Sequence, residues 1–62
     1  MPVIRISGPA NVSKETKKEL IEKTSKTVSD CYGLPIQTIT VIIDEIPADN
    51  VGAAGEQLSE KE

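Results

Sequence analysis

The sequence predicts an α/β fold in which one helix connects two parallel strands, a β-α-β unit. β-Branched residues cluster in two short segments, residues 2–7 and 38–44. Between them, residues 14–32 contain no glycine or proline. The first pattern favours strands, and the second favours a helix. A strand, a helix and a strand in this order imply a right-handed crossover, which makes the two strands parallel.

The first predicted strand begins at Pro2, a position where the missing N–H of proline is tolerated. Because side chains alternate across a strand, Ile4 and Ile6 share one face and Arg5 lies on the other. The Gly-Pro pair at residues 8–9 is predicted to end the strand.

The helix has clear start and stop signals. Ser13 is an N-cap candidate, Gly33 is a natural left-handed C-cap, and Pro35 prevents continuation. Apolar or small side chains recur at three- and four-residue spacing, which predicts the face that packs on the sheet. These residues are Leu20, Ile21, Thr24, Val28 and Cys31.

The second predicted strand contains the adjacent residues Ile42 and Ile43, so both of its faces are expected to be covered. Beyond it, residues 50–54 are predicted to form a short strand or a C-terminal hairpin. Residues 58–62 are polar and are predicted to fray.

The composition predicts that one chain is unstable alone. The chain has 62 residues, 37% of them hydrophobic, and Tyr32 is its only aromatic residue. Cys31 is the only cysteine and there is no histidine, so neither an internal disulfide nor a zinc site is expected. A two-stranded sheet covered by one helix leaves one face and both edges open. Partner subunits are therefore expected, with the sheet extended across a dimer.

The charge pattern argues against several classes of partner. The net charge is −3 and Arg5 is the only arginine, so no nucleic-acid partner is expected. Two helical pairs, Glu19 with Lys23 and Glu22 with Lys26, indicate a solvated face. No apolar run is long enough to span a membrane, and no signal peptide is recognisable, so a cytoplasmic location is expected.

Several segments in this order resemble the 4-oxalocrotonate tautomerase family. Pro2 follows Met1 and opens the run Pro-Val-Ile-Arg-Ile, and the helix carries Lys-Glu-Leu-Ile at residues 18–21. Pro35 precedes the second strand, and residues 50–56 read Asn-Val-Gly-Ala-Ala-Gly-Glu. The resemblance covers almost the whole chain and implies one tautomerase-like domain over residues 1–62.

The resemblance implies an isomerase that moves a proton on a small unsaturated 2-hydroxy or 2-oxo acid. The general base would be Pro2 after removal of Met1, without a metal or organic cofactor. An α-amino group titrates near neutrality, at roughly 7.7–8.0, and desolvation lowers that value, so the chemistry is reasonable. The family also forms homohexamers, usually described as trimers of dimers.

The sequence departs from the family at the substrate-binding positions. Well-known members bind substrate carboxylates with two arginines and line the pocket with an aromatic residue. This chain has Val12, Thr40 and Val51 at the corresponding places. Thr40 and Val51 are therefore named as pocket positions, while binding of a dicarboxylate by the usual route is not expected. Arg5 aligns with neither missing arginine and is expected to form a structural ion pair.

Two other readings stay open. The chain can be a non-catalytic oligomer of the same fold that binds a small molecule or has a structural role. Another proline-dependent activity, such as hydration or decarboxylation, cannot be separated from tautomerisation by sequence. Cys31 is near the C-terminal end of the helix, where the helix dipole does not favour a thiolate, so we interpret it as a packing residue.

Overall fold

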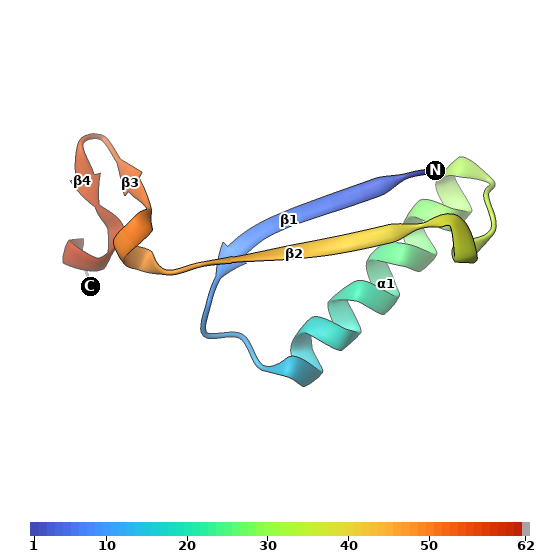
Figure 1. The fold of residues 1–62 in the computed structure, drawn as a ribbon, viewed down its shortest axis with the longest axis horizontal. Helices are drawn as coiled ribbons and strands as arrows, with labels where there is room; N and C mark the ends of the chain where they lie inside the picture. The colour runs from blue at the N-terminus through green and yellow to red at the C-terminus, as the bar shows by residue number, and fades with distance from the viewer. Residues whose placement is uncertain (62) are drawn as a thin grey trace.

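Two parallel strands and one helix form the body of the subunit in the computed structural model, which describes residues 1–61 (Figure 1). Strand β1 (Val3–Pro9) pairs in parallel with strand β2 (Thr40–Ile46), and helix α1 (Lys14–Tyr32) connects them across one face. The predicted β-α-β unit is confirmed. Within residues 1–61, no helix combines the length and the apolar character needed to cross a membrane.

Helix α1 begins and ends where the sequence predicts. The Ser13 hydroxyl accepts a hydrogen bond from the backbone N–H of Thr16 at 3.1 Å. Gly33 adopts a left-handed conformation with φ 67°, and its N–H donates to the carbonyl of Ser29 at 2.9 Å. Both caps satisfy backbone groups that the ends of a helix leave unpaired.

Replacing Gly33 tests this cap. Gly33→Ala should lower the free energy of unfolding by about 1 kcal/mol, because a Cβ is disfavoured in the left-handed region even where space is open. Gly33→Asn should lower the free energy of unfolding by less, since asparagine tolerates this conformation better than alanine does. Chemical denaturation at one fixed protein concentration measures both. Equal stability of the alanine and glycine proteins would contradict the role of the cap.

The predicted end of the first strand at residues 8–9 is wrong, because β1 continues through Pro9. The backbone N–H of Thr40 donates to the carbonyl of Pro2 at 3.1 Å, so the backbone of Pro2 points toward β2. Successive residues of a strand point their backbone groups to opposite sides, which turns Gly8 toward β2 and Pro9 toward the free edge. A missing N–H at that edge breaks no hydrogen bond to β2.

Strand β2 begins two residues later than predicted and ends later as well. A short 3-10 turn, Ile36–Thr38, occupies the predicted start. Its last residue, Thr38, bonds back to the carbonyl of Pro35 through both its N–H, at 3.0 Å, and its hydroxyl, at 2.7 Å. The local turn therefore takes precedence over the strand preference of the threonine.

The short C-terminal hairpin is confirmed, with different bounds. Strand β3 (Gly52–Ala53) pairs antiparallel with strand β4 (Glu56–Gln57). The two residues between them have positive φ, 55° at Ala54 and 78° at Gly55, as tight hairpin turns require. A 3-10 turn at Ala48–Asn50 precedes the hairpin, and another at Leu58–Lys61 replaces the predicted fraying. Of the predicted frayed end, Glu62 lies outside the described residues.

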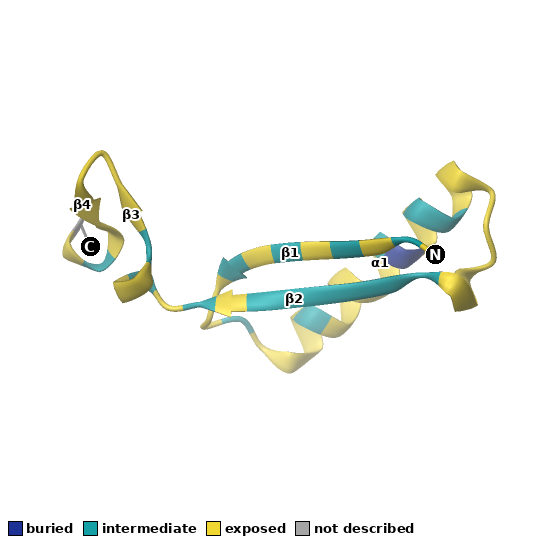
Figure 2. Cartoon of the chain, turned by 45° about the horizontal axis from the view of Figure 1, so that its top comes forward, coloured by how far each residue is buried: buried dark blue, intermediate teal, exposed yellow. Residues whose placement is uncertain are grey.

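The subunit has almost no core of its own. Ser25 is the only buried residue, and no apolar side chain is buried, among those whose burial the structure describes (Figure 2). The radius of gyration is 14.7 Å, whereas a compact chain of this length has about 11 Å. The hairpin projects past the end of the sheet (Figure 1). Even the predicted packing face of α1 is partly exposed, with Leu20 and Ile21 each 38% exposed. Cys31 is also exposed, so it is not a packing residue within the single chain.

Two ion pairs on α1 join side chains that are one helical turn apart. The predicted pair between Glu19 and Lys23 is present, but Lys26 bonds to Asp30 at 2.8 Å and not to Glu22. Both carboxylates lie one helical turn from Lys26, so its ammonium can reach either one. The hydrogen bond and the charge of Asp30 raise the pKa of Lys26.

Candidate active site at the chain start

A pocket of about 200 Å³ surrounds Pro2, where the start of β1 meets the last turns of α1. In a parallel β-α-β unit the helix runs back along the sheet, so its C-terminal end lies over the first residues of the strands. This geometry brings residues far apart in sequence to one site. The pocket is lined by Pro2, Val3, Ile4, Thr27, Val28, Cys31 and Tyr32.

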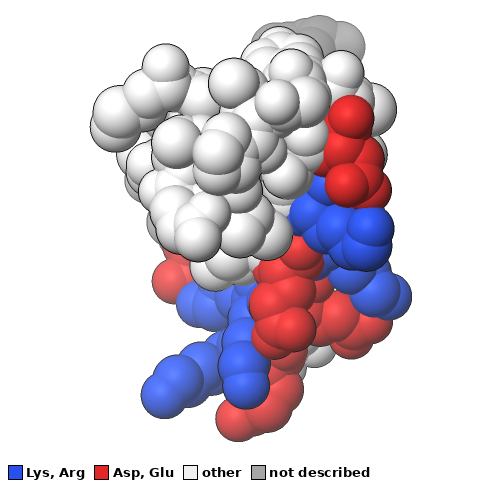
Figure 3. All heavy atoms as spheres, turned by 90° about the vertical axis from the view of Figure 1, so that its right-hand side faces the viewer, with Lys and Arg blue, Asp and Glu red and all other residues white. Residues whose placement is uncertain are grey.

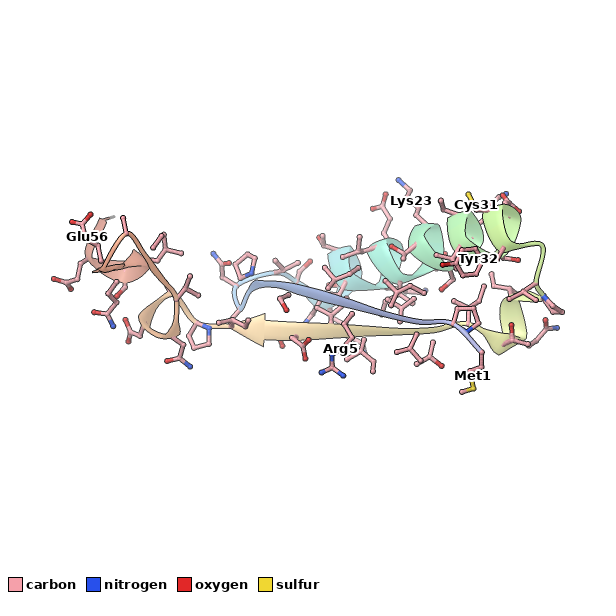
Figure 4. All side chains as sticks on the ribbon, turned by 90° about the horizontal axis from the view of Figure 1, so that it is seen from above. Met1, Arg5, Lys23, Cys31, Tyr32 and Glu56 are labelled. Atoms are coloured by element: carbon pink, nitrogen blue, oxygen red, sulfur yellow. The ribbon has the colours of Figure 1, made fainter. Side chains whose placement is uncertain are left out.

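Tyr32 is the residue of this pocket that the sequence did not single out for function. Figure 4 shows its side chain between α1 and the start of the chain. The residue is 67% exposed, and its hydroxyl has no hydrogen-bond partner among the described residues. Its place in the last turn before the Gly33 cap is the signal that could have identified it, because the crossover returns that turn to Pro2.

Thr40 lies beside Pro2 but does not line its pocket. The two residues share the backbone hydrogen bond of 3.1 Å, and Thr40 is in register with Val3 on β1. The alternation of the strand turns the Thr40 side chain to the sheet face opposite α1. A substrate in the Pro2 pocket would therefore not contact the hydroxyl of Thr40 from the same chain.

Val51 lies at the other end of the subunit, next to β3. It belongs to a larger groove of about 710 Å³ between the end of the sheet and the C-terminal arm. The groove is lined by Ser7, Gly8, Pro9, Ala10, Asn11, Ile46, Pro47, Ala48, Val51 and Leu58. One chain thus does not bring Pro2 and Val51 together, and a site that contains both requires two copies of the chain.

Among the side chains that the structure describes, no charged one lines either the Pro2 pocket or the groove. Arg5 lies on the sheet face away from α1, as predicted, and forms an ion pair with Asp44 at 3.0 Å (Figure 4). Figure 3 views the subunit from the end that carries the chain start, where a broad uncharged area lies beside clustered charged side chains. The lining of the Pro2 pocket therefore includes two neutral residues that carry a hydroxyl, Thr27 and Tyr32.

The match to known proteins covers nearly the whole chain. The family described as tautomerase enzyme matches residues 2–61. A probable tautomerase of Dickeya dadantii is 40% identical over 62 residues, which cover 98% of this chain and 92% of the relative. The 2-hydroxymuconate tautomerase of Bacillus subtilis is 31% identical over the full length of both chains.

Solved structures agree with this match. The crystal structure of one homologue of 4-oxalocrotonate tautomerase has a TM-score of 0.93 at 30% identity and covers 98% of this chain and 100% of that one. A heterohexameric 4-oxalocrotonate tautomerase from Chloroflexus aurantiacus has a TM-score of 0.90 at 27% identity and covers 97% of each chain. These matches agree in fold and in length, so the chain belongs to the tautomerase family, whose members are isomerase enzymes.

Proposed function

We propose that the protein catalyses enol–keto tautomerisation, or the equivalent proton shift between carbons, on a small unsaturated 2-hydroxy or 2-oxo acid. Pro2 is the general base of this proposal, and it acts once Met1 has been removed. The observation that carries the proposal is the small pocket at Pro2 in a chain of the tautomerase family.

In this mechanism the free amine of Pro2 takes a proton from the substrate and returns it to another carbon. A base works best when its pKa lies near the working pH, and an α-amino group meets that condition. An apolar, uncharged surrounding disfavours the ammonium form and keeps the amine available. The pyrrolidine ring holds the lone pair in one direction. The reaction needs no metal and no organic cofactor.

The assembly in this proposal is a homohexamer, a trimer of dimers, of one-domain subunits spanning residues 1–62 in the cytoplasm. The missing core and the open sheet face support assembly, as does the heterohexameric relative from Chloroflexus aurantiacus. Extension of the sheet across a dimer would pair one free edge. Contacts between dimers would bring Thr40 and Val51 of other copies to Pro2 and complete the pocket.

A non-catalytic oligomer that binds a small molecule, or serves structurally, is the second candidate. The uncharged lining of the Pro2 pocket favours it, because nothing there attracts an anionic substrate. Loss of a hydrogen bond to a charged group removes about 1.5–3 kcal/mol, so a site without arginines binds carboxylates weakly. Measuring whether the protein turns over an enol acid distinguishes the catalytic candidate from the non-catalytic one.

The test is turnover of a panel of enol acids by protein whose Pro2 amino terminus is verified by intact mass. Pro2→Ala should lower kcat/KM by about a hundred-fold or more, since it replaces the general base with a more flexible amine. Pro35→Ala is a matched control, because this proline is exposed and lies outside the pocket. Equal loss in both variants, or no turnover of any enol acid, would favour the non-catalytic candidate.

A further inference from the structure

Tyr32 brings a phenol to the lining of the Pro2 pocket. Tyr32 lies in the last turn of α1 and lines the pocket together with Pro2 of the same chain. Its hydroxyl has no hydrogen-bond partner among the described residues, so substrate binding would break no hydrogen bond within the protein. A phenol can donate one hydrogen bond and does so without carrying charge near neutral pH.

The cationic side chains that the structure describes lie outside the Pro2 pocket. Among the cationic side chains that the structure describes, four form ion pairs: Arg5 with Asp44, Lys17 with Glu45, Lys23 with Glu19 and Lys26 with Asp30. The remaining two, Lys14 and Lys18, are exposed in the first turns of α1, at the opposite end of the helix from Tyr32. Copies of one chain bring the same set of cations, so assembly adds no arginine beyond Arg5.

We propose that Tyr32 is a substrate-contacting residue of this site, donating its hydroxyl to the oxygen of an enol that carries at most one carboxylate. This inference rests on the proposed function. When Pro2 removes the proton from the substrate, negative charge develops on the substrate oxygen, and the Tyr32 hydroxyl stabilises it by hydrogen bonding while keeping its own proton. The proton on Pro2 then returns to another carbon. A second carboxylate would enter an uncharged pocket without a cation to receive it.

The experiment uses the assembled protein that begins at Pro2 and two matched substrates. One is 2-hydroxymuconate, which has two carboxylates, and the other is the 2-hydroxydienoate that lacks the distal carboxylate. The unsubstituted protein should turn over the monoacid with a kcat/KM at least ten-fold higher than the diacid. Tyr32→Phe should lower kcat for the monoacid roughly ten- to hundred-fold with little change in KM, because the bond strengthens as charge develops.

Thr24→Val is the matched control, since it removes a hydroxyl from the same helix outside the pocket and should change kcat by less than about three-fold. Light scattering confirms that each variant keeps its assembly. Unchanged kcat in Tyr32→Phe, an equal loss in Thr24→Val, or preference for the diacid would overturn the inference while Pro2-dependent turnover upholds the proposed function. Absence of turnover, or turnover that Pro2→Ala leaves intact, would overturn both.

Discussion

Protein that retains Met1 is expected to show about a thousand-fold lower kcat/KM for an enol acid than protein that begins at Pro2. With Met1 attached, the Pro2 nitrogen belongs to a peptide bond, and resonance withdraws its lone pair. Such a nitrogen cannot accept a proton near neutral pH, and a general base contributes about a hundred- to ten-thousand-fold to rate. Met1 is 90% exposed, so its removal disturbs no packing of the subunit.

Intact mass identifies the two forms, and both are assayed with the same substrate and at the same assembly state. Treatment of the Met1-retaining form with a methionine aminopeptidase supplies the control, because it should restore activity in the same preparation. The rate for the Pro2 form should rise with pH and then level off as its amine loses its proton. Equal activity of the two forms would exclude Pro2 as the base.

The second large effect is expected from Ile42→Lys, which should abolish the assembly and with it the folded subunit. Ile42 lies in the middle of β2, and the strand alternation places it on the sheet face that α1 leaves open. It is also in register with Arg5, so the new ammonium meets a like charge. If a neighbouring subunit covers this face, an unpaired buried ammonium costs on the order of 3 kcal/mol or more in every subunit.

Glu22→Lys introduces the same side chain on the exposed surface of α1 and should leave the assembly intact. It should lower the free energy of unfolding by about a few tenths of a kcal/mol, because the like charges of Lys18 and Lys26 lie one helical turn away. Light scattering at micromolar concentration, together with far-ultraviolet circular dichroism, measures both variants. A folded monomer of the unsubstituted protein, or an intact hexamer of Ile42→Lys, would contradict the proposal that subunits cover this face.

The helix was predictable to the residue because its signals are local. The hydroxyl of Ser13 and the left-handed Gly33 act on neighbouring backbone groups, and nothing between them interrupts the helix. The ends of the strands were not predictable in this way. Whether Pro9 ends a strand depends on which side its missing N–H faces, and that follows from the pairing of β1 with β2.

The sequence by itself determined the β-α-β order and the family, since both follow from residue type, spacing and resemblance, and it predicted partner subunits and Pro2 as the base. Only the tertiary structure decided what surrounds Pro2. The crossover brings Tyr32 from the end of α1 to the chain start, whereas it leaves Val51 in a groove at the opposite end of the subunit. These spatial neighbours depend on how the helix lies across the sheet, and no local pattern of residues encodes which of them come close together.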